Sequence, residues 1–445
     1  MRIDRRHGRF AAVAAALTAL LAAAACGGGG ESGGGAGKSG GESGGKITLT
    51  LDTFGNFGYK ALIDQYQQAH PNIKIEHRIV QRFEDQYLPR MTQWLNAGRG
   101  AGDVIGIDEG AMGLMAANPG YFTDLAQFGL DKRESEFPPF KWQAGINSEG
   151  KLFALGTDVG GLNMCYRKDL FEKAGLPTDR EEVAKLWPDW NGYLETGKKF
   201  AAKNTGKDDP KFVDGPNTVY EAVLAQEAAK NGNITYFDKQ NQLVVDKNPA
   251  VKAAFDYVQQ VSKAGLTAKL RAFDPTWDTG FKKGQFATIA CPSWMLGIIE
   301  EKTGAEGKGQ WDVAAVPGGG GNWGGSWLAV PKQSKHPKEA ADLLNFLTSK
   351  DGHIGAFKEA KGLPSSLPAQ QDAAVTGLTS EYFNNAPVGK IFTASVTSLQ
   401  PVFLGKDHAA VKAAVGRVVE GMDQGSIKYD QAWQRFLDAG KSAAR

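Results

Sequence analysis

Residues 47–80 read ITLTLDTFGNFGYKALIDQYQQAHPNIKIEHRIV, and this stretch decides the fold. Apolar and polar residues alternate over 47–51, which predicts a strand, and apolar side chains then recur at helical spacing over 59–66. Pro71 ends that helix, and 73–80 is predicted to be a second strand. Strand, helix and strand in succession predict a parallel sheet covered by helices.

The alternation of strands and helices continues along the chain. Residues 83–95 repeat the helical period, and the strand DVIGI at 103–107 ends at Asp108 and Glu109. Further strands are expected at 162–166, 286–291, 313–316 and 327–330, and helices are expected near 169–174, 190–203, 219–231 and 250–264, between the first two of these strands. The chain from residue 47 onward is about 400 residues long, which exceeds one hydrophobic core and favours two lobes.

The N-terminus has the three parts of a secretory signal. Arg2, Arg5, Arg6 and Arg9 precede a run of 16 uncharged residues at 10–25. This run is shorter than the about 20 apolar residues of a membrane span, so residues 1–25 are predicted to be a signal peptide. The paired arginines leave a twin-arginine export route open.

Cys26 follows this run directly and resembles the cysteine of a bacterial lipobox, although Ala23 stands where leucine is usual. The resemblance implies that Cys26 is diacylated and becomes the mature N-terminus. An ordinary secretory signal with an incidental cysteine is the alternative. Residues 26–46 then form a flexible Gly/Ser tether. We expect an extracytoplasmic protein, anchored by lipid to the outer face of the cell membrane.

The remaining composition argues against several classes of partner. Without residues 1–26 the chain has 47 basic and 48 acidic side chains, so no basic excess points to nucleic acid. The six histidines lack metal-ligand spacing and no nucleotide-binding loop is complete, so we expect no metal and no cofactor. Cys165 and Cys291 lie in apolar runs and are predicted to be separate buried thiols, with a disulfide as the alternative.

Several segments of the chain resemble the extracellular solute-binding proteins of ABC sugar importers, the family that includes maltose-binding protein. The segments are LDTFGNFGYKALIDQYQQAHP (51–71), IKIEHRIV (73–80), GDVIGIDEG (102–110), LFALGTDVGGLNMCYRKDLFEKAGLP (152–177), FKKGQFATIACPSWMLG (281–297) and WDVAAVPGGGGNWGGSWLAVPKQSKHPKEAADLLNFL (311–347). Their order and spacing carry the resemblance, which extends from residue 47 to near residue 440. The Gly-rich tether and GGGGNWGGSWLAVP are most similar to cello-oligosaccharide-binding lipoproteins.

The resemblance implies a two-lobed periplasmic-binding-protein-like α/β fold, with mainly parallel sheets, hinge crossovers and a ligand cleft between the lobes. The expected N-terminal lobe is 47–157 plus 317–360, and the expected C-terminal lobe is 158–316 plus 361–445. The implied function is capture of an oligosaccharide, best cellobiose or cellotriose, for delivery to the transmembrane subunits of an ABC permease. We expect a monomer without catalytic activity.

Candidate ligand contacts follow from the chemistry of sugars. A pyranose ring has C–H faces that suit indole rings and hydroxyl edges that suit carboxylates, amides and guanidinium groups. Four tryptophans lie in Gly-, Pro- or Ser-rich stretches near strand ends, where such folds place ligands, and are predicted to contact sugar: Trp277, Trp294, Trp323 and Trp327. For Trp323 and Trp327, one ring is expected to face the cleft and the other the core. The polar candidates are Asn56, Arg82, Asp108, Glu109 and Asp158.

Other interpretations of these residues stay open. Asp108 closes a strand and opens a helix, so its carboxylate can simply cap that helix. A secreted carbohydrate-active enzyme would need two carboxylates across a bond, and the adjacent Asp108 and Glu109 diverge. A receptor for another oligosaccharide, or for a peptide, polyamine or metal, is the remaining alternative.

Overall fold

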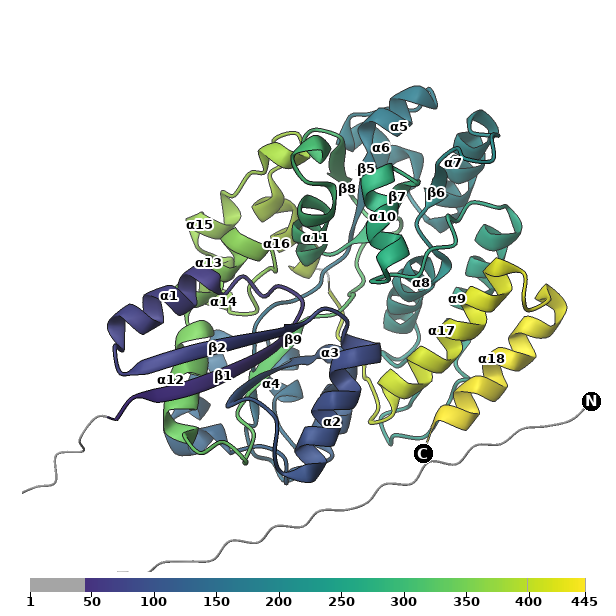
Figure 1. The fold of residues 1–445 in the computed structure, drawn as a ribbon. Helices are drawn as coiled ribbons and strands as arrows, with labels where there is room; N and C mark the ends of the chain where they lie inside the picture. Colours follow the sequence, from purple (N-terminus) through teal and green to yellow (C-terminus); the bar gives the residue numbers. More distant parts are fainter. Residues whose placement is uncertain (1–44, 398, 445) are drawn as a thin grey trace, which may run out of the picture. The chain divides into compact units, whose positions relative to one another are not determined.

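The computed structural model describes residues 45–397 and 399–444, which form two lobes, each built around one β-sheet (Figure 1). The first sheet has the strand order β2-β1-β3-β9-β4 and the second has the order β6-β7-β5-β8. The first sheet contains β1 (Ile47–Phe54), β2 (Ile73–Val80), β3 (Val104–Asp108), β4 (Ala154–Gly156) and β9 (Ser326–Ala329). The second contains β5 (Asn163–Arg167), β6 (Lys211–Val213), β7 (Phe286–Cys291) and β8 (Trp311–Ala314).

Both sheets are mixed. In the first, β1 is parallel to β2 and β3, whereas β9 is antiparallel to β3 and β4. In the second, β6 and β7 are parallel, but β5 is antiparallel to both of its neighbours. The predicted two-lobed α/β fold is confirmed, and each mainly parallel sheet has one reversed strand, β9 in the first sheet and β5 in the second. The reason is that β5 and β9 each follow a crossover from the other lobe, so they enter their sheets from the opposite end.

Helices surround both sheets. The α-helices are α1 (Lys60–Ala69), α2 (Leu88–Ala97), α3 (Glu109–Ala116), α4 (Pro139–Ala144), α5 (Lys168–Lys173), α6 (Arg180–Leu186), α7 (Trp190–Lys203), α8 (Pro216–Lys230), α9 (Pro249–Lys263), α10 (Pro275–Lys283), α11 (Ser293–Thr303), α12 (Pro337–Leu347), α13 (Lys350–Ala360), α14 (Leu367–Gln370), α15 (Ala373–Thr376), α16 (Val388–Thr397), α17 (His408–Gln424) and α18 (Tyr429–Ala443). Short 3₁₀ turns are η2 (Leu125–Phe128), η3 (Leu130–Glu136), η4 (Ala305–Gly307) and η5 (Glu381–Phe383).

The helix expected over residues 83–95 is divided in two. Its first part, η1 (Phe83–Tyr87), is a π-helical turn, and α2 continues from it to Ala97. Gly98 ends α2 in the left-handed conformation with φ 62°, as the sequence predicts. The π-turn places the charged residues that follow β2 at the edge of the first lobe, where the two lobes meet.

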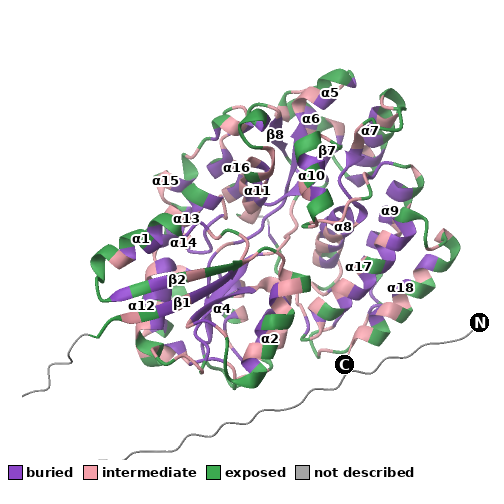
Figure 2. Ribbon diagram, in the orientation of Figure 1, coloured by how far each residue is buried: buried purple, intermediate pink, exposed green. Residues whose placement is uncertain are grey.

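Each sheet is covered on both faces by hydrophobic side chains. Because successive residues of a strand point to opposite faces, Leu328 joins one core of the first lobe while Trp327 and Ala329 join the other. In the second lobe, Cys165 of β5 belongs to a different core from Met164. Figure 2 shows the strands largely buried, with exposed residues on the outward faces of the helices.

The chain crosses between the lobes along segments that bond to one another. Residues 157–162 join β4 to β5, and residues 315–325 join β8 to β9. Backbone hydrogen bonds run from Trp323 N to Gly160 O at 2.9 Å and from Thr157 N to Ser326 O at 2.8 Å. A third segment after α13 adds bonds from Val159 N to Leu363 O and from Ser365 N to Thr157 O. The crossovers therefore form one hydrogen-bonded ribbon. The residues at which each lobe begins and ends stay a prediction.

Cys165 and Cys291 form a disulfide, with their Cα atoms 5.4 Å apart. The prediction of two separate buried thiols is therefore wrong. Both cysteines are buried, as expected, but the antiparallel register of β5 and β7 brings Cys165 opposite Ile289 and Asn163 opposite Cys291. This register places both sulfurs on the same face of the sheet, which their sequence separation of 126 residues does not reveal.

The predicted signal peptide, Cys26 and nearly all of the tether lie outside the described residues. Within residues 45–397 and 399–444, none of the helices combines the length and the apolar character that crossing a membrane requires.

Candidate functional site

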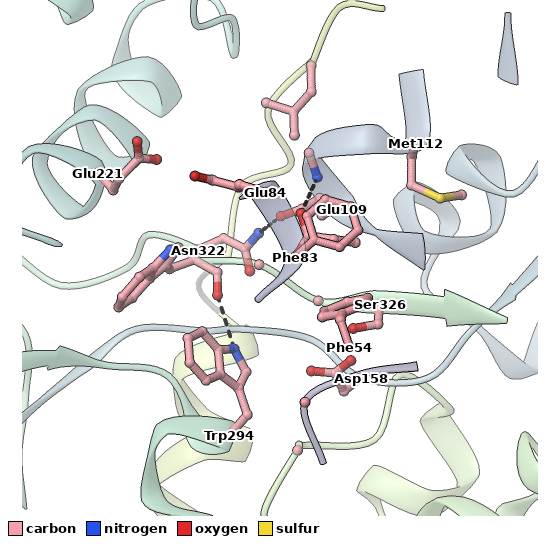
Figure 3. Close-up of a pocket in the computed structure, with 18 of the residues that line it drawn as sticks. Phe54, Phe83, Glu84, Glu109, Met112, Asp158, Glu221, Trp294, Asn322 and Ser326 are labelled. Atoms are coloured by element: carbon pink, nitrogen blue, oxygen red, sulfur yellow. Dashed lines mark hydrogen bonds between the residues drawn. The ribbon is translucent and has the colours of Figure 1, made fainter. Parts of the chain in front are cut away.

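A cavity of about 1080 Å³ lies between the two sheets and is lined by residues of both lobes. All nine predicted ligand contacts line it: Asn56, Arg82, Asp108, Glu109, Asp158, Trp277, Trp294, Trp323 and Trp327. The first lobe contributes residues from the ends of β1, β2 and β3, and the second contributes the starts of α10 and α11. Figure 3 shows Trp294 on one side of the cavity, across from the carboxyl groups of Glu109 and Asp158.

Trp294 and Trp323 form an aromatic corner in the cavity. Trp294 is the second residue of α11, and its indole N–H donates to the Trp323 carbonyl at 3.2 Å. The two ring centres are 5.2 Å apart and the ring planes meet at 64°. Both side chains are only partly buried, so their rings retain accessible surface toward the cavity. Such a corner can contact a sugar ring on a face and on an adjoining edge.

Trp277 and Trp327 are buried in the cores instead. Trp277 is 0% exposed and its indole N–H donates to Asp214 Oδ2 at 2.8 Å. Trp327 is 1% exposed and donates to the Lys141 carbonyl at 3.1 Å. Trp277 and Trp294 also lie in the first turns of helices rather than in loops. Of the pair Trp323 and Trp327, Trp327 is therefore the core residue.

The first lobe presents a polar group of residues at the start of α3. Asp108 accepts a hydrogen bond from Gly110 N at 2.8 Å, so the helix-capping alternative is confirmed. Glu109 Oε2 accepts a hydrogen bond of 2.6 Å from Asn322 Nδ2, which belongs to the Gly-rich crossover (Figure 3). Whether a ligand contacts either carboxyl group stays a prediction.

A buried lysine lies beside these carboxyl groups. Lys141 is 1% exposed, and its ammonium nitrogen lies 3.2 Å from the ring centre of Trp327, a cation–π contact. Gly325 has φ 133°, and a Cβ there would approach Lys141 Nζ to 2.9 Å. A glycine is therefore required at this position, both for its backbone conformation and for the space beside the amine.

Burial favours the uncharged form of Asp108, Glu109 and Lys141, so it raises the pKa of the two carboxyl groups and lowers the pKa of the lysine. Burial raises the pKa of Asp108 to about 6, with Lys412 opposing the shift. Burial also raises the pKa of Glu109 and lowers the pKa of Lys141, and the charge of each opposes the shift of the other. A carboxyl group whose pKa is close to neutral can both donate and accept hydrogen bonds, as sugar hydroxyls do.

Asp158 lies at the start of the first crossover between the lobes. Asn56 lies in the Gly-rich turn that follows β1. Asp158 accepts a 3.0 Å hydrogen bond from the Thr157 hydroxyl and lies in the backbone ribbon between the lobes. Asn56 is exposed, and its side-chain oxygen accepts from Gly58 N at 2.9 Å, which holds the turn after β1. Both side chains line the cavity, and their contact with a ligand stays a prediction.

Arg82 pairs with a residue of the other lobe. Its Nη1 lies 2.6 Å from Asp274 Oδ1 at the start of α10. Its neighbour Asp85 accepts from Arg271 Nη2 at 3.1 Å. The segment that follows β2 thus makes two ion pairs across the cleft.

A third ion pair crosses the cleft on α17. Lys412 Nζ lies 3.1 Å from Glu84 Oε1 of the first lobe and 3.8 Å from Glu221 Oε2 of the second. Burial alone would lower the pKa of Lys412, but the charges of Glu221, Glu84 and Asp108 outweigh burial and raise it. These ion pairs join the two lobes across the cleft.

Sequence reasoning missed several residues of the cavity. Phe273, Asn322, Lys141 and Lys412 lie in or beside it, and none was predicted. Asn322 could have been found from its position between Gly321 and Trp323 in the Gly-rich crossover. Lys141 and Lys412 occur in helices whose charged residues are typical of solvent-exposed faces, so the sequence carries no signal for them.

In the part of the chain that the structure describes, no group of three or more His, Cys, Asp or Glu side chains is arranged to hold a metal ion. The buried histidines are used otherwise. His353 contacts the carbonyl of Gly156, and burial lowers the pKa of His353 to about 4. His408 lies 3.4 Å from the Thr235 hydroxyl, and burial lowers the pKa of His408 to about 3.

Comparison with known proteins adds a family match and several relatives. The family model described as bacterial extracellular solute-binding protein matches residues 61–382. The arabinooligosaccharide-binding protein of Bacillus subtilis (strain 168) is 24% identical over 401 residues, covering 86% of this chain and 89% of that protein.

Solved structures match over nearly the whole described chain. A crystal structure of an extracellular solute-binding protein family 1 member has a TM-score of 0.76 at 36% identity, covering 90% of this chain and 100% of that one. The ABC transporter associated binding protein from B. animalis subsp. lactis Bl-04, in complex with β-1,6-galactobiose, has a TM-score of 0.76 at 21% identity, covering 89% and 98%. These similarities agree with the two-lobed fold described above.

Proposed function

Because the chain belongs to the bacterial extracellular solute-binding proteins, we propose that it binds an oligosaccharide between its lobes and delivers it to the permease of an ABC importer. One observation carries the proposal, namely a cavity of about 1080 Å³ that combines accessible aromatic rings with carboxyl and amide groups. These groups match the C–H faces and hydroxyl edges of sugars. Small-ligand sites usually have about 300–1,000 Å³, so this volume supports a ligand of more than one sugar ring.

The roles of the nine candidate residues follow from how each is already bonded. Trp294 and Trp323 stack against sugar rings, and Trp277 supports them from the core of the second lobe, while Trp327 belongs to a core of the first lobe. Asp108, Glu109 and Asp158 bond sugar hydroxyls from the first lobe and the crossover, together with Asn56. The guanidinium of Arg82 is engaged by Asp274, so it reaches the ligand only through its remaining N–H groups.

The identity of the sugar is a finer proposal. The Gly-rich segment GGGGNWGGSWLAVP resembles cello-oligosaccharide binders, which supports cellobiose or cellotriose as the ligand. Two relatives carry other ligands in their names: an arabinooligosaccharide-binding protein and a protein solved with β-1,6-galactobiose. Arabino- and galacto-oligosaccharides are therefore the alternatives to test beside the cello series.

A titration separates these ligands and also tests the function. The mature protein is titrated with cellobiose, cellotriose, arabinotriose, β-1,6-galactobiose, maltose and xylobiose, while tryptophan fluorescence and heat are followed. We expect saturable binding of at least one oligosaccharide, strongest for the cello series, with no release of monosaccharide. Release of monosaccharide would indicate an enzyme, and absence of binding to every sugar would contradict the proposal.

We also propose that Cys26 carries the lipid that keeps the protein at the outer face of the membrane, within reach of its permease. The family is extracellular, which agrees with export, but Cys26 lies outside the described residues. The intact mass of protein purified from membranes should correspond to a chain that begins at Cys26 and carries acyl groups. A mature chain that begins elsewhere, or lacks the acyl mass, would show an ordinary secretory signal. We also propose that the protein is a monomer, with an N-terminal lobe of residues 47–157 plus 317–360 and a C-terminal lobe of residues 158–316 plus 361–445.

A further inference from the structure

Phe273 leaves an aromatic ring open to the cavity. Among residues 45–397 and 399–444, the exposed large hydrophobic side chains are Ile79 and Phe273, and 38% of Phe273 is exposed. Unlike Ile79, Phe273 lines the cavity between the lobes. Apolar surface inside a ligand cavity is stabilised when a ligand removes it from water.

The backbone at Phe273 is strained. Asp274 N donates to Arg271 O at 3.2 Å, which closes a four-residue turn with Phe273 as its third residue. Phe273 has φ 68°, and a turn with positive φ at this position normally takes glycine or asparagine. A bulky residue in the left-handed region persists only where its surroundings hold it, and such residues cluster at ligand-binding sites.

The first lobe holds this turn from both sides. Arg82 pairs with Asp274 at 2.6 Å, and Asp85 pairs with Arg271 at 3.1 Å, so the two ion pairs flank Phe273 in the sequence. Asp274 is the N-cap residue of α10, yet its carboxylate makes no capping hydrogen bond to that helix. The carboxylate is directed to the other lobe instead. We call this arrangement of Arg82, Asp85, Arg271 and Asp274 the cross-lobe clamp.

The ring of Phe273 extends the surface of Trp294. The two ring centres are 6.3 Å apart and their planes differ by 30°. A slot that encloses a sugar ring between two aromatic faces needs about 7–8 Å, twice a van der Waals contact. The two rings therefore form neighbouring parts of one apolar floor, and Trp323, 6.4 Å from Phe273, forms its wall.

We propose that Phe273 is a ligand-contacting residue that binds the outer, third ring of an oligosaccharide whose inner rings stack on Trp294 and Trp323. The cross-lobe clamp positions Phe273 over this ring when the lobes are closed. The inference rests on the proposed function and makes a statement about ligand length. The third ring adds affinity because it covers the exposed surface of Phe273.

The test compares a disaccharide with its trisaccharide on the mature protein, using cellobiose and cellotriose, or the corresponding pair of the series that binds. Phe273→Ala should raise the Kd for the trisaccharide about tenfold and leave the Kd for the disaccharide within about threefold. Phe273→Tyr keeps the ring and should bind both sugars as the unchanged protein does. Equal weakening of both sugars, no weakening of either, or no gain from the third ring in the unchanged protein would overturn the inference.

Two glycine variants separate the loss of the Phe273 ring from a disturbed backbone. Phe273→Gly suits φ 68°, so the turn should form, and this variant should lose trisaccharide affinity as Phe273→Ala does. Lys269→Gly is the matched control, because Lys269 has φ 58°, is exposed and does not line the cavity. This control should leave both affinities unchanged. A loss with Lys269→Gly equal to that with Phe273→Gly would assign the effect to the backbone and overturn the inference. Absence of binding to all sugars would instead contradict the proposed function itself.

The clamp is tested by a double-mutant cycle on the same two sugars. Arg82→Gln and Asp274→Asn should each raise the Kd for the trisaccharide about threefold, and the double variant should be no weaker than the weaker single variant. Effects that multiply would mean that Arg82 and Asp274 act on sugar binding independently rather than through their ion pair, which would overturn the positioning role of the clamp.

Discussion

Replacing Trp294 with alanine is expected to weaken oligosaccharide binding by well over tenfold while leaving the free protein folded. A sugar ring that covers an indole face removes apolar surface from water and gains ring-face contact, together about 2 kcal/mol or more. Each 1.4 kcal/mol corresponds to about a tenfold change in Kd. The loss should fall on every sugar that binds, because the Trp294 ring lies close to both other rings, 5.2 Å from Trp323 and 6.3 Å from Phe273.

The free energy of unfolding should fall far less than the binding energy. Trp294 is partly exposed in the free protein, and its one side-chain hydrogen bond goes to the Trp323 carbonyl. Losing this bond and the ring contacts should cost about 1 kcal/mol. Calorimetric titration and denaturant unfolding of the same variant separate the two quantities. Unchanged affinity together with a loss of several kcal/mol in stability would make Trp294 a core residue.

Trp433→Ala is the matched control for this experiment. Trp433 is also partly buried, but it lies on α18, where it packs against Phe255 and stacks on Phe436 at 5.3 Å between ring centres. Its removal should lower the free energy of unfolding by about 2–3 kcal/mol and leave the Kd unchanged. Trp294→Ala should therefore change mainly the Kd, and Trp433→Ala should change mainly the free energy of unfolding.

Removing the Cys165–Cys291 disulfide is expected to lower the free energy of unfolding by about 3–4 kcal/mol. The bond joins β5 and β7 across a sequence separation of 126 residues, so it restricts the unfolded chain over a long loop. Unfolding in guanidinium should be followed with and without a thiol reductant and in the double variant Cys165→Ala, Cys291→Ala. Sugar affinity should stay within about twofold, because neither cysteine lines the cavity.

The double variant also supplies the control for the reductant. Without the two cysteines, adding reductant should leave the unfolding midpoint where it is. If the oxidised and reduced forms of the unchanged protein unfold at the same denaturant concentration, the disulfide contributes nothing to stability and the expectation is wrong.

The architecture could be predicted from the sequence wherever local pattern decides the structure. The strand at 286–291 and the helix Trp190–Lys203 were expected with the bounds that the structure gives them, because their apolar periods are uninterrupted. The direction of β5 and β9 could not be predicted from such periods. It depends on the chain changing lobes before each strand, which is a property of the topology rather than of local sequence.

The sequence predicted residues that line the cavity, but it did not predict which tryptophan rings have accessible surface there. Proximity to strand ends placed Trp277 and Trp294 at the cleft, and both line it. Which ring has an accessible surface depends on the first turn of α10 and of α11, and no local pattern distinguishes the two. Phe273 was missed for a related reason, since a phenylalanine at a turn position suited to glycine has no recognisable signature. The Cys165–Cys291 bond was missed because strand register is set by packing across the sheet.

The hydrogen-bonded ribbon of crossovers restricts how the lobes can move. Because residues 157–162 bond to both the Gly-rich crossover and residues 363–365, sliding one lobe past the other would break several backbone bonds at once. Bending about an axis through the ribbon breaks none of them in principle, which is the behaviour of a hinge rather than of a shear interface. Relative motion of the two lobes is therefore easiest as bending about the ribbon. A ligand would therefore leave by reversal of the same bending that encloses it.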